Sequence, residues 1–299
     1  MKRNIFGIII ILSFLGCKSG SSDFDANGSF EAVEIIVSSE ASGKIVTFNL
    51  TEGDLLKENQ IVGCVDTVQL YLSRLLLEAN QKTVLSRKTD ISIQIASIQE
   101  QIRNQESEKI RFEYLVKSDA GTQKQVDDIT AQILILERQL TAQKTAMQTS
   151  NLSIENEYKA LEIQIAQIND KIEKSLIKSP IDGTVLVKYS EKGELTQMGK
   201  PLFKIADTEN MFLKAYVTAD QLSRIKTGQN VKVSADFGKD GYRDYDGVIT
   251  WISDKSEFTP KNILTKDERA NLVYAIKVAV KNDGYLKIGM YGQMTIGNN

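Results

Sequence analysis

Histidine is absent from this chain of 299 residues, and proline occurs only three times, at positions 180, 201 and 260. Without histidine, Ser-His-Asp and Cys-His catalytic sites and histidine metal sites are excluded. The formal net charge is only −2, and the lysines and arginines are scattered, so no basic patch predicts a nucleic-acid partner. We therefore expect no enzyme activity, no catalytic, cofactor-binding or metal-binding residues, and no nucleic acid. The scarcity of proline permits long uninterrupted helices.

The first 17 residues, MKRNIFGIIIILSFLGC, have the pattern of a secretory signal peptide. Two basic residues precede an apolar run, Ile5–Leu15, which is too short to span a bilayer comfortably. The run ends in Phe14-Leu15-Gly16-Cys17, which resembles the lipobox of bacterial lipoproteins. That resemblance implies cleavage before Cys17 and attachment of a diacylglyceryl group to its thiol, with residues 18–28 as a flexible tether. The alternative is a plain secretory signal with an incidental cysteine.

Residues 67–175 have the pattern of a long coiled coil, with one glycine and no proline. Apolar residues recur at every seventh position, which is typical of helices that pack along a common seam. The first series is Leu70, Leu77, Val84, Ile91 and Ile98, and the second is Val126, Ile133, Leu140, Met147, Ile154, Leu161 and Ile168. In the second series the companion apolar positions change their offset from three residues to four near Met147–Ile154. The seam therefore shifts once at that point.

One polar stretch, Lys117–Thr122, interrupts the helical pattern. Gly121 can end a helix or form a turn, and Thr122 can cap the next helix. We therefore predict two antiparallel helices of about 50 residues, joined by a short turn and projecting on the order of 75 Å.

The segments on either side of the predicted hairpin repeat the same short motif. GKIVTFNLTEGDL begins at Gly43 and GTVLVKYSEKGEL begins 140 residues later, at Gly183. Residues 29–66 and 176–207 are each too small to bury a core alone, so we expect them to form one β unit once the hairpin returns the chain. We predict turns at the glycines of the motif, which are Gly43, Gly53, Gly183 and Gly193.

The last segment, residues 208–299, has the pattern of a small antiparallel barrel. Short apolar strands are expected at 211–217, 229–236, 247–253, 272–280 and 293–297. Thr218 and Gln221 form a capping box, which predicts one short helix between the first two strands.

Residues 179–207, SPIDGTVLVKYSEKGELTQMGKPLFKIAD, resemble the second half of the biotinyl/lipoyl-like domain in periplasmic adaptor proteins of the HlyD family, also called membrane fusion proteins. Residues 228–236 and 276–294 resemble the β-barrel segments of that family. The resemblance implies an α+β multidomain fold, in which a long coiled-coil hairpin is inserted into a split biotinyl/lipoyl-like domain and followed by a small β-barrel. True lipoyl carriers hold a modified lysine where this chain has its helices, so no carrier role is expected.

The same resemblance implies a function and its partners. Such adaptors link an inner-membrane transporter to a TolC-like outer-membrane channel for export or efflux, and six copies form a ring. The chain ends at Asn299, where adaptors of resistance-nodulation-division (RND) pumps usually continue into another β domain, so an ABC transporter is favoured over an RND partner. The expected location is the periplasm of a Gram-negative bacterium, with a lipid anchor in the inner membrane. The alternative is a lipid-anchored structural coiled-coil protein without a transport role.

The predicted hairpin tip carries a second resemblance. Adaptors that dock on TolC-like channels have Arg-Leu-x-x-Leu followed, after six residues, by Ser. This chain has Arg111, Phe112 and Leu115, then Thr122 at the same spacing. The resemblance implies that Phe112 and Leu115 anchor in an apolar groove while Arg111 and Thr122 form hydrogen bonds. The alternative is an ordinary hairpin end whose apolar residues close the coiled coil.

Overall fold

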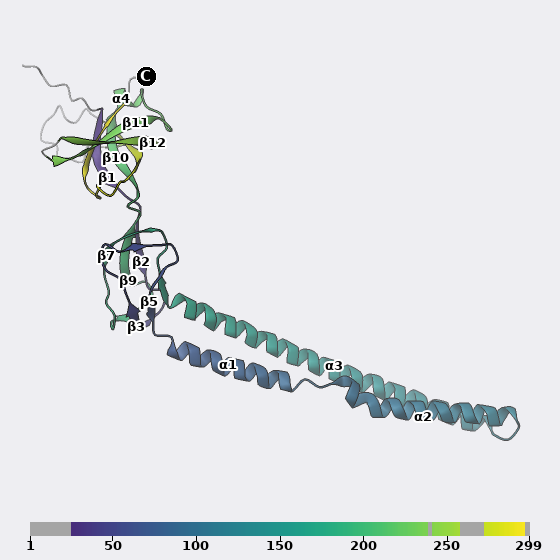
Figure 1. Ribbon diagram of the computed structural model, residues 1–299. Helices are drawn as coiled ribbons and strands as arrows, with labels where there is room; N and C mark the ends of the chain where they lie inside the picture. The colour runs from purple at the N-terminus through teal and green to yellow at the C-terminus, as the bar shows by residue number, and fades with distance from the viewer. Residues whose placement is uncertain (1–24, 239–240, 258–271, 297–299) are drawn as a thin grey trace, which may run out of the picture.

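The computed structural model describes residues 25–238, 241–257 and 272–296. The expected signal peptide, the lipid site Cys17 and the tether up to residue 24 lie outside these ranges. The described chain forms three parts in a row: a six-stranded barrel, a β unit of two sheets, and a helical hairpin (Figure 1). None of the helices within these ranges is both long enough and apolar enough to cross a membrane.

The hairpin consists of three helices, of which the third runs antiparallel to the other two (Figure 1). They are α1 (Val68–Ser86), α2 (Ile91–Lys117) and α3 (Gln123–Lys174). At 1.5 Å per residue, the 52 residues of α3 span roughly 80 Å. The buried side chains belong to the predicted heptad series or to its companion positions, which confirms the seam. These side chains are Val84, Ile95, Ile98, Val126, Ile133, Leu136 and Ile154.

The first arm is not the single helix that we predicted, because it breaks between α1 and α2 at residues 87–90. The break contains neither glycine nor proline. Instead, the carboxylate of Asp90 accepts a hydrogen bond from the backbone N–H of Ser92 (2.9 Å) and thereby caps a new helix.

Contacts from α3 hold the break in place. The backbone N–H of Thr89 donates to Asn151 Oδ1 (3.1 Å), and Asn151 Nδ2 donates to the carbonyl oxygen of Thr89 (2.8 Å). Arg87 also forms an ion pair with Glu157 (2.6 Å). Asn151 lies within Met147–Ile154, where the heptad offset changes. The break in one arm therefore lies opposite the seam shift in the other.

The β unit between barrel and hairpin is built from residues on both sides of the hairpin, and we call it the split β unit. Its strands are β2 (Glu34–Ser38), β3 (Gly43–Phe48), β4 (Leu55–Leu56), β5 (Ile61–Val65), β6 (Leu176–Lys178), β7 (Gly183–Lys188), β8 (Leu195–Thr196) and β9 (Pro201–Ala206). One sheet has the order β2-β9-β7-β4 and the other β6-β5-β3-β8. Because β3 pairs with β8 and β4 with β7, the predicted association of the two halves is confirmed.

Residues 140 positions apart occupy equivalent places in the split β unit. The backbone N–H of Gly53 donates to the carbonyl oxygen of Val185 (2.9 Å), and that of Gly193 donates to the carbonyl oxygen of Ile45 (2.8 Å). Ile45 and Val185 are themselves equivalent and both are buried. The two halves are thus related by a pseudo-two-fold axis, and each completes the hydrogen bonding of the other.

We predicted turns at all four motif glycines, but only two of them form turns. Gly53 and Gly193 do, with φ values of +94° and +95° that favour glycine. Gly43 and Gly183 are instead the first residues of β3 and β7, and our prediction of turns there was wrong. A Cβ atom at Gly183 would lie 2.4 Å from the carbonyl oxygen of Ala206, so this position requires glycine because two strands approach closely.

The barrel closes in the order β1-β10-β13-β12-β11-β14. Its elements are β1 (Ala26–Glu31), β10 (Asn210–Thr218), α4 (Ala219–Leu222), β11 (Asn230–Asp236), β12 (Tyr242–Glu257), β13 (Val273–Lys281) and β14 (Tyr291–Thr295). The predicted short helix is confirmed as α4, since Thr218 N–H donates to Gln221 Oε1 (2.9 Å) and Gln221 N–H to Thr218 Oγ1 (3.4 Å).

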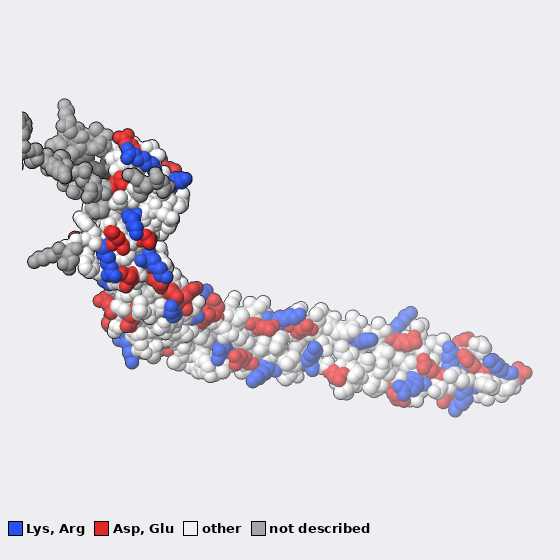
Figure 2. All heavy atoms as spheres, turned by 45° about the horizontal axis from the view of Figure 1, so that its top comes forward, with Lys and Arg blue, Asp and Glu red and all other residues white. Residues whose placement is uncertain are grey.

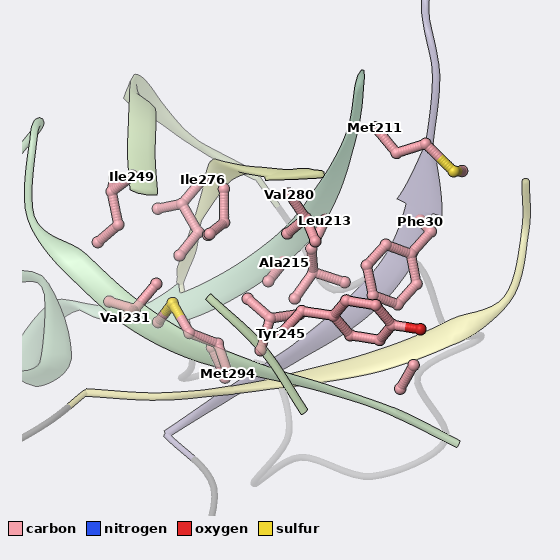
Figure 3. Close-up of a cluster of buried hydrophobic side chains, with 14 of the residues drawn as sticks. Phe30, Met211, Leu213, Ala215, Val231, Tyr245, Ile249, Ile276, Val280 and Met294 are labelled. Atoms are coloured by element: carbon pink, nitrogen blue, oxygen red, sulfur yellow. The ribbon is translucent and has the colours of Figure 1, made fainter. Parts of the chain in front are cut away.

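The first barrel strand comes from a part of the chain that we had assigned elsewhere. Residues 26–28 were expected in the tether and residues 29–31 in an N-terminal strand that we grouped with the first half of the split β unit, but all six form β1, which pairs with β10 and β14. Phe30 explains the correction, because its ring is fully buried among barrel side chains such as Leu213 (Figure 3). The ring lies so close to Gly292 that a Cβ there would be 2.6 Å from it.

Candidate functional site at the hairpin tip

The tip begins where α2 ends, in a turn built by backbone hydrogen bonds. The N–H of Ala120 donates to the carbonyl oxygen of Leu115 (2.9 Å), and the N–H of Asp119 donates to that of Val116 (3.1 Å). Asp119 has φ +55° and so takes the left-handed place that we expected Gly121 to fill. Gly121 has a different role, because a Cβ on it would lie 3.1 Å from Leu115 Cβ.

Thr122 directly precedes α3 and is its N-cap, as predicted. Its backbone N–H and its hydroxyl both donate to Gln125 Oε1 at 3.0 Å. These bonds satisfy an N–H that the helix itself leaves unpaired. The Thr122 side chain remains exposed, so its oxygen is within reach of a binding partner.

Arg111 lies on the exposed side of the last turns of α2. Its guanidinium donates to the carboxylate of Glu108, one turn earlier on the same helix. The same group lies 5.4 Å from the centre of the Phe112 ring, within the range of a cation–π contact. Glu108 and Phe112 therefore orient Arg111 before any partner binds.

The apolar residues of the tip differ in exposure. Phe112 is half-buried and Leu115 is 36% exposed, so both still offer apolar surface. The sequence motif did not identify two neighbours that protrude further, Ile110 and Tyr114, the latter 74% exposed. Their apolar character beside the predicted turn was the signal that could have identified them. The apolar part of the tip is therefore larger than the predicted pair.

Charges of both signs intermingle along the hairpin and around its tip (Figure 2). At the tip, Lys117 stands 6.0 Å from the Tyr114 ring, and the exposed carboxylates include Glu113 and Asp119. A mixed surface produces no strong field of one sign. Shape, apolar contact and local hydrogen bonds are therefore the means by which this tip can bind a partner.

The sequence matches no protein-family profile. The structure is similar to MacA from Actinobacillus actinomycetemcomitans, with a TM-score of 0.55 and 18% identity over 90% of this chain and 76% of MacA. It is also similar to a MacA–MexA chimeric protein that contains the α-hairpin domain of MexA from Pseudomonas aeruginosa. There the TM-score is 0.52 and the identity 22%, over 91% of this chain and 81% of the chimera.

A third similar structure is the membrane fusion protein Spr0693 from Streptococcus pneumoniae R6, with a TM-score of 0.50 and 18% identity. This similarity covers 91% of the present chain and 98% of Spr0693. The protein therefore shares the fold of a membrane fusion protein. The resemblance predicted from residues 179–207 and 228–236 is confirmed at the level of the fold.

Proposed function

We propose that this protein is a non-enzymatic periplasmic adaptor, which links an inner-membrane transporter to a TolC-like outer-membrane channel for export of small molecules or other cargo. The observation that carries the proposal is the insertion of a roughly 80 Å hairpin between two interlocked halves of one β unit. Because both arms start from the split β unit, the hairpin is fixed at its base and presents its tip far from the barrel (Figure 1).

The barrel is the part that we propose lies near the inner membrane. Ala26, the first residue of β1, lies only nine positions after Cys17, and such a segment spans at most about 30 Å. A lipid on Cys17 would therefore keep the barrel close to the bilayer. Each buried CH₂ of the acyl chains contributes about 0.8 kcal/mol to anchoring.

The split β unit is proposed to be a biotinyl/lipoyl-like domain that packs beside its copies in a ring of six. The hairpins would then stand together as a tube. We propose an ABC transporter as the inner-membrane partner of the ring. Co-purification tests this choice, since it would recover an RND transporter if that were the partner.

At the far end, we propose that Phe112 and Leu115 insert into a groove of the channel, while Arg111 and Thr122 form hydrogen bonds at its rim. Arg111 is held in an exposed position by Glu108 and by the Phe112 ring. Tyr114 and Ile110 add exposed apolar area beside them. Buried aromatic and arginine residues commonly supply most of the binding energy of such contacts.

The test is to introduce Arg111→Asp and Leu115→Asp separately into the full chain. Matched controls are Arg138→Asp and Leu152→Asp, which change exposed residues of α3 away from the tip. We expect both tip variants to lose the outer-membrane channel on co-purification, and to fail to complement a strain that lacks the gene. Circular dichroism and membrane fractionation should be unchanged. If both tip variants complement fully, the tip assignment is wrong, and the structural coiled-coil alternative gains support.

A further inference from the structure

The outer face of the barrel carries two lysines that lie directly opposite each other. Lys214 in β10 and Lys277 in β13 are in register across the two antiparallel strands. Their strand neighbours Leu213 and Val278 are fully buried in the barrel core, so both lysines point outward. Like charges at directly opposed positions destabilise a sheet. Among the described residues neither lysine forms an ion pair, although two other lysines of the barrel do.

Aromatic rings stand around these two lysines. Lys277 Nζ lies 4.5 Å from the centre of the Phe212 ring and 5.9 Å from that of the Trp251 ring. Lys214 Nζ lies 6.0 Å from the centre of the Tyr216 ring. Trp251 is 42% exposed, and the other four side chains are half-buried. We call these five residues the lysine–aromatic patch. Tryptophan, tyrosine and lysine are the side chains that concentrate where proteins meet the membrane–water interface.

We propose that the lysine–aromatic patch binds the surface of an anionic lipid bilayer, the membrane that holds the proposed anchor. The inference rests on the proposed function, since it assigns the surface through which the barrel meets that membrane. The tether argues for the bilayer as the occupant, because β1 begins nine positions after Cys17, a span of at most about 30 Å. Ser29 of β1 is in register with Lys214. The patch therefore begins on the strand next to the one that the tether enters.

Charge complementarity also favours the bilayer. Anionic headgroups compensate the two opposed ammonium groups and so remove the repulsion that the barrel otherwise bears. Two lysines near such a surface correspond to a roughly 30-fold preference for anionic over uncharged lipid. The exposed indole of Trp251 can enter the headgroup region beside them. A patch of this strength suffices here because the anchor already holds the protein at the membrane, so binding is intramolecular in effect.

The test uses the fluorescence of Trp251, the only tryptophan of the chain, which therefore reports on the patch alone. The full lipidated chain is reconstituted through its own anchor into vesicles of phosphatidylcholine with brominated acyl chains, with or without phosphatidylglycerol. We expect bromine to quench the emission, and the emission to shift to shorter wavelength, only when phosphatidylglycerol is present. High salt should reverse both effects. Absence of quenching in both kinds of vesicle, or equal quenching in both, would overturn the proposal.

Matched variants test the role of the two lysines. Lys214→Gln combined with Lys277→Gln should reduce the quenching at least tenfold, and arginine at both positions should retain it. The control combines Lys232→Gln with Lys281→Gln, which removes the same charge from two barrel lysines that form ion pairs. This control should be quenched as the wild type is. Equal loss of quenching in the control would mean that net charge, and not the patch, governs binding.

Two further outcomes separate the patch from other interpretations. If the glutamine variant of the patch keeps its quenching but loses the inner-membrane transporter on co-purification, the patch binds a protein and the proposal is wrong. If quenching fails while Leu115→Asp at the hairpin tip still loses the channel, only the patch is wrong. If quenching occurs as expected while Leu115→Asp keeps full function, the patch stands and the docking function does not.

Discussion

Asn151 binds both backbone groups of Thr89, accepting from its N–H at 3.1 Å and donating to its carbonyl oxygen at 2.8 Å. One side chain on the continuous helix α3 thus replaces the helical hydrogen bonds that are lost where α1 ends and α2 has not yet begun. Asn151 is the residue that makes a break tolerable in the middle of a long coiled coil.

Asn151→Ala is expected to loosen the hairpin locally. The loss of two partly solvated hydrogen bonds should cost about 1 kcal/mol in the stability of the helices around the break. Hydrogen exchange measured by mass spectrometry should quicken in residues 87–91 and remain unchanged in the barrel. Asn156→Ala, at an exposed position on the same helix, is the matched control and should leave exchange as in the wild type. Equal exchange in both variants would contradict the role of Asn151.

Thr196→Val is expected to stabilise the protein. Thr196 is 2% exposed, and its hydroxyl has no hydrogen-bond partner among the described residues. Its equivalent in the first half is the buried Leu56, which shows that an apolar side chain fits the equivalent position. Removal of the unpaired hydroxyl at nearly constant shape should raise the free energy of unfolding by about 1 kcal/mol, measured by chemical denaturation.

The control for Thr196→Val is Thr184→Val in β7, a strand of the other sheet. The Thr184 hydroxyl is 2.7 Å from that of Thr208 and shares a hydrogen bond with it. Valine at 184 should therefore lower stability where valine at 196 raises it. If both substitutions shift the midpoint in the same direction, the hydroxyl of Thr196 is not unpaired.

Asp182 should make the stability of the split β unit depend on pH. Its carboxylate accepts from the N–H of Glu58 (2.7 Å) and from Lys57 Nζ (3.1 Å), both in the other half. These contacts, the backbone N–H first, lower the pKa of Asp182 below its ordinary value. A lowered folded-state pKa means that the stabilisation is present above about pH 4 and is lost as the pH falls through the folded-state value.

We expect Asp182→Ala to lower the thermal midpoint at pH 7, and to lower it less at pH 3. Asp182→Ser is the informative second variant, because Ser42 already accepts the equivalent bond from Met198 N–H (3.2 Å) in the symmetric position. Serine should therefore recover part of the loss without any pH dependence. A difference between wild type and Asp182→Ala that is equal at both pH values would refute the electrostatic account.

Cys17→Ser should abolish membrane anchoring. The lipobox-like sequence predicts that a diacylglyceryl group is attached to this thiol, and serine does not provide the sulfur to which it would bond. Metabolic labelling with palmitate should mark the wild type only, and the variant should be soluble or retain its uncleaved leader. Cys64→Ser is the matched control and should be labelled normally. Palmitate in the Cys17→Ser protein would place the anchor elsewhere.

The association of the two β halves could be predicted from the sequence, because the repeat between Gly43 and Gly183 preserves the residues that matter on both sides. Gly53 and Gly193 keep the turn, and Ile45 and Val185 keep the core. The hairpin could be predicted equally well, since its apolar residues recur every seven positions along the sequence.

The break at 87–90 was missed because its cause is a contact between residues 62 positions apart, and because Asp90 is an ordinary surface residue in composition. The only sequence signal of the break was in the other arm, where the heptad offset changes near Met147–Ile154. A helix end without glycine or proline has a weak sequence signal, and the partner helix decides where it falls.

The assignment of β1 was wrong for a related reason. Its partners in the barrel, β10 and β14, lie more than 180 residues further along the chain, and six residues have no periodicity from which to infer them. At the tip, we expected Gly121 to be the left-handed residue after α2, because glycine is the commoner residue in that conformation. The left-handed residue is instead Asp119.

The central claim, that the hairpin tip contacts an outer-membrane channel, is tested most directly by photo-cross-linking in living cells. A photoreactive amino acid replaces Tyr114 at the tip or Leu152 in α3, both of which are exposed. We predict that position 114 cross-links to an outer-membrane channel protein, identified by mass spectrometry, and that position 152 does not. Failure of position 114 to capture any outer-membrane channel, with the protein folded and membrane-bound, would contradict the account.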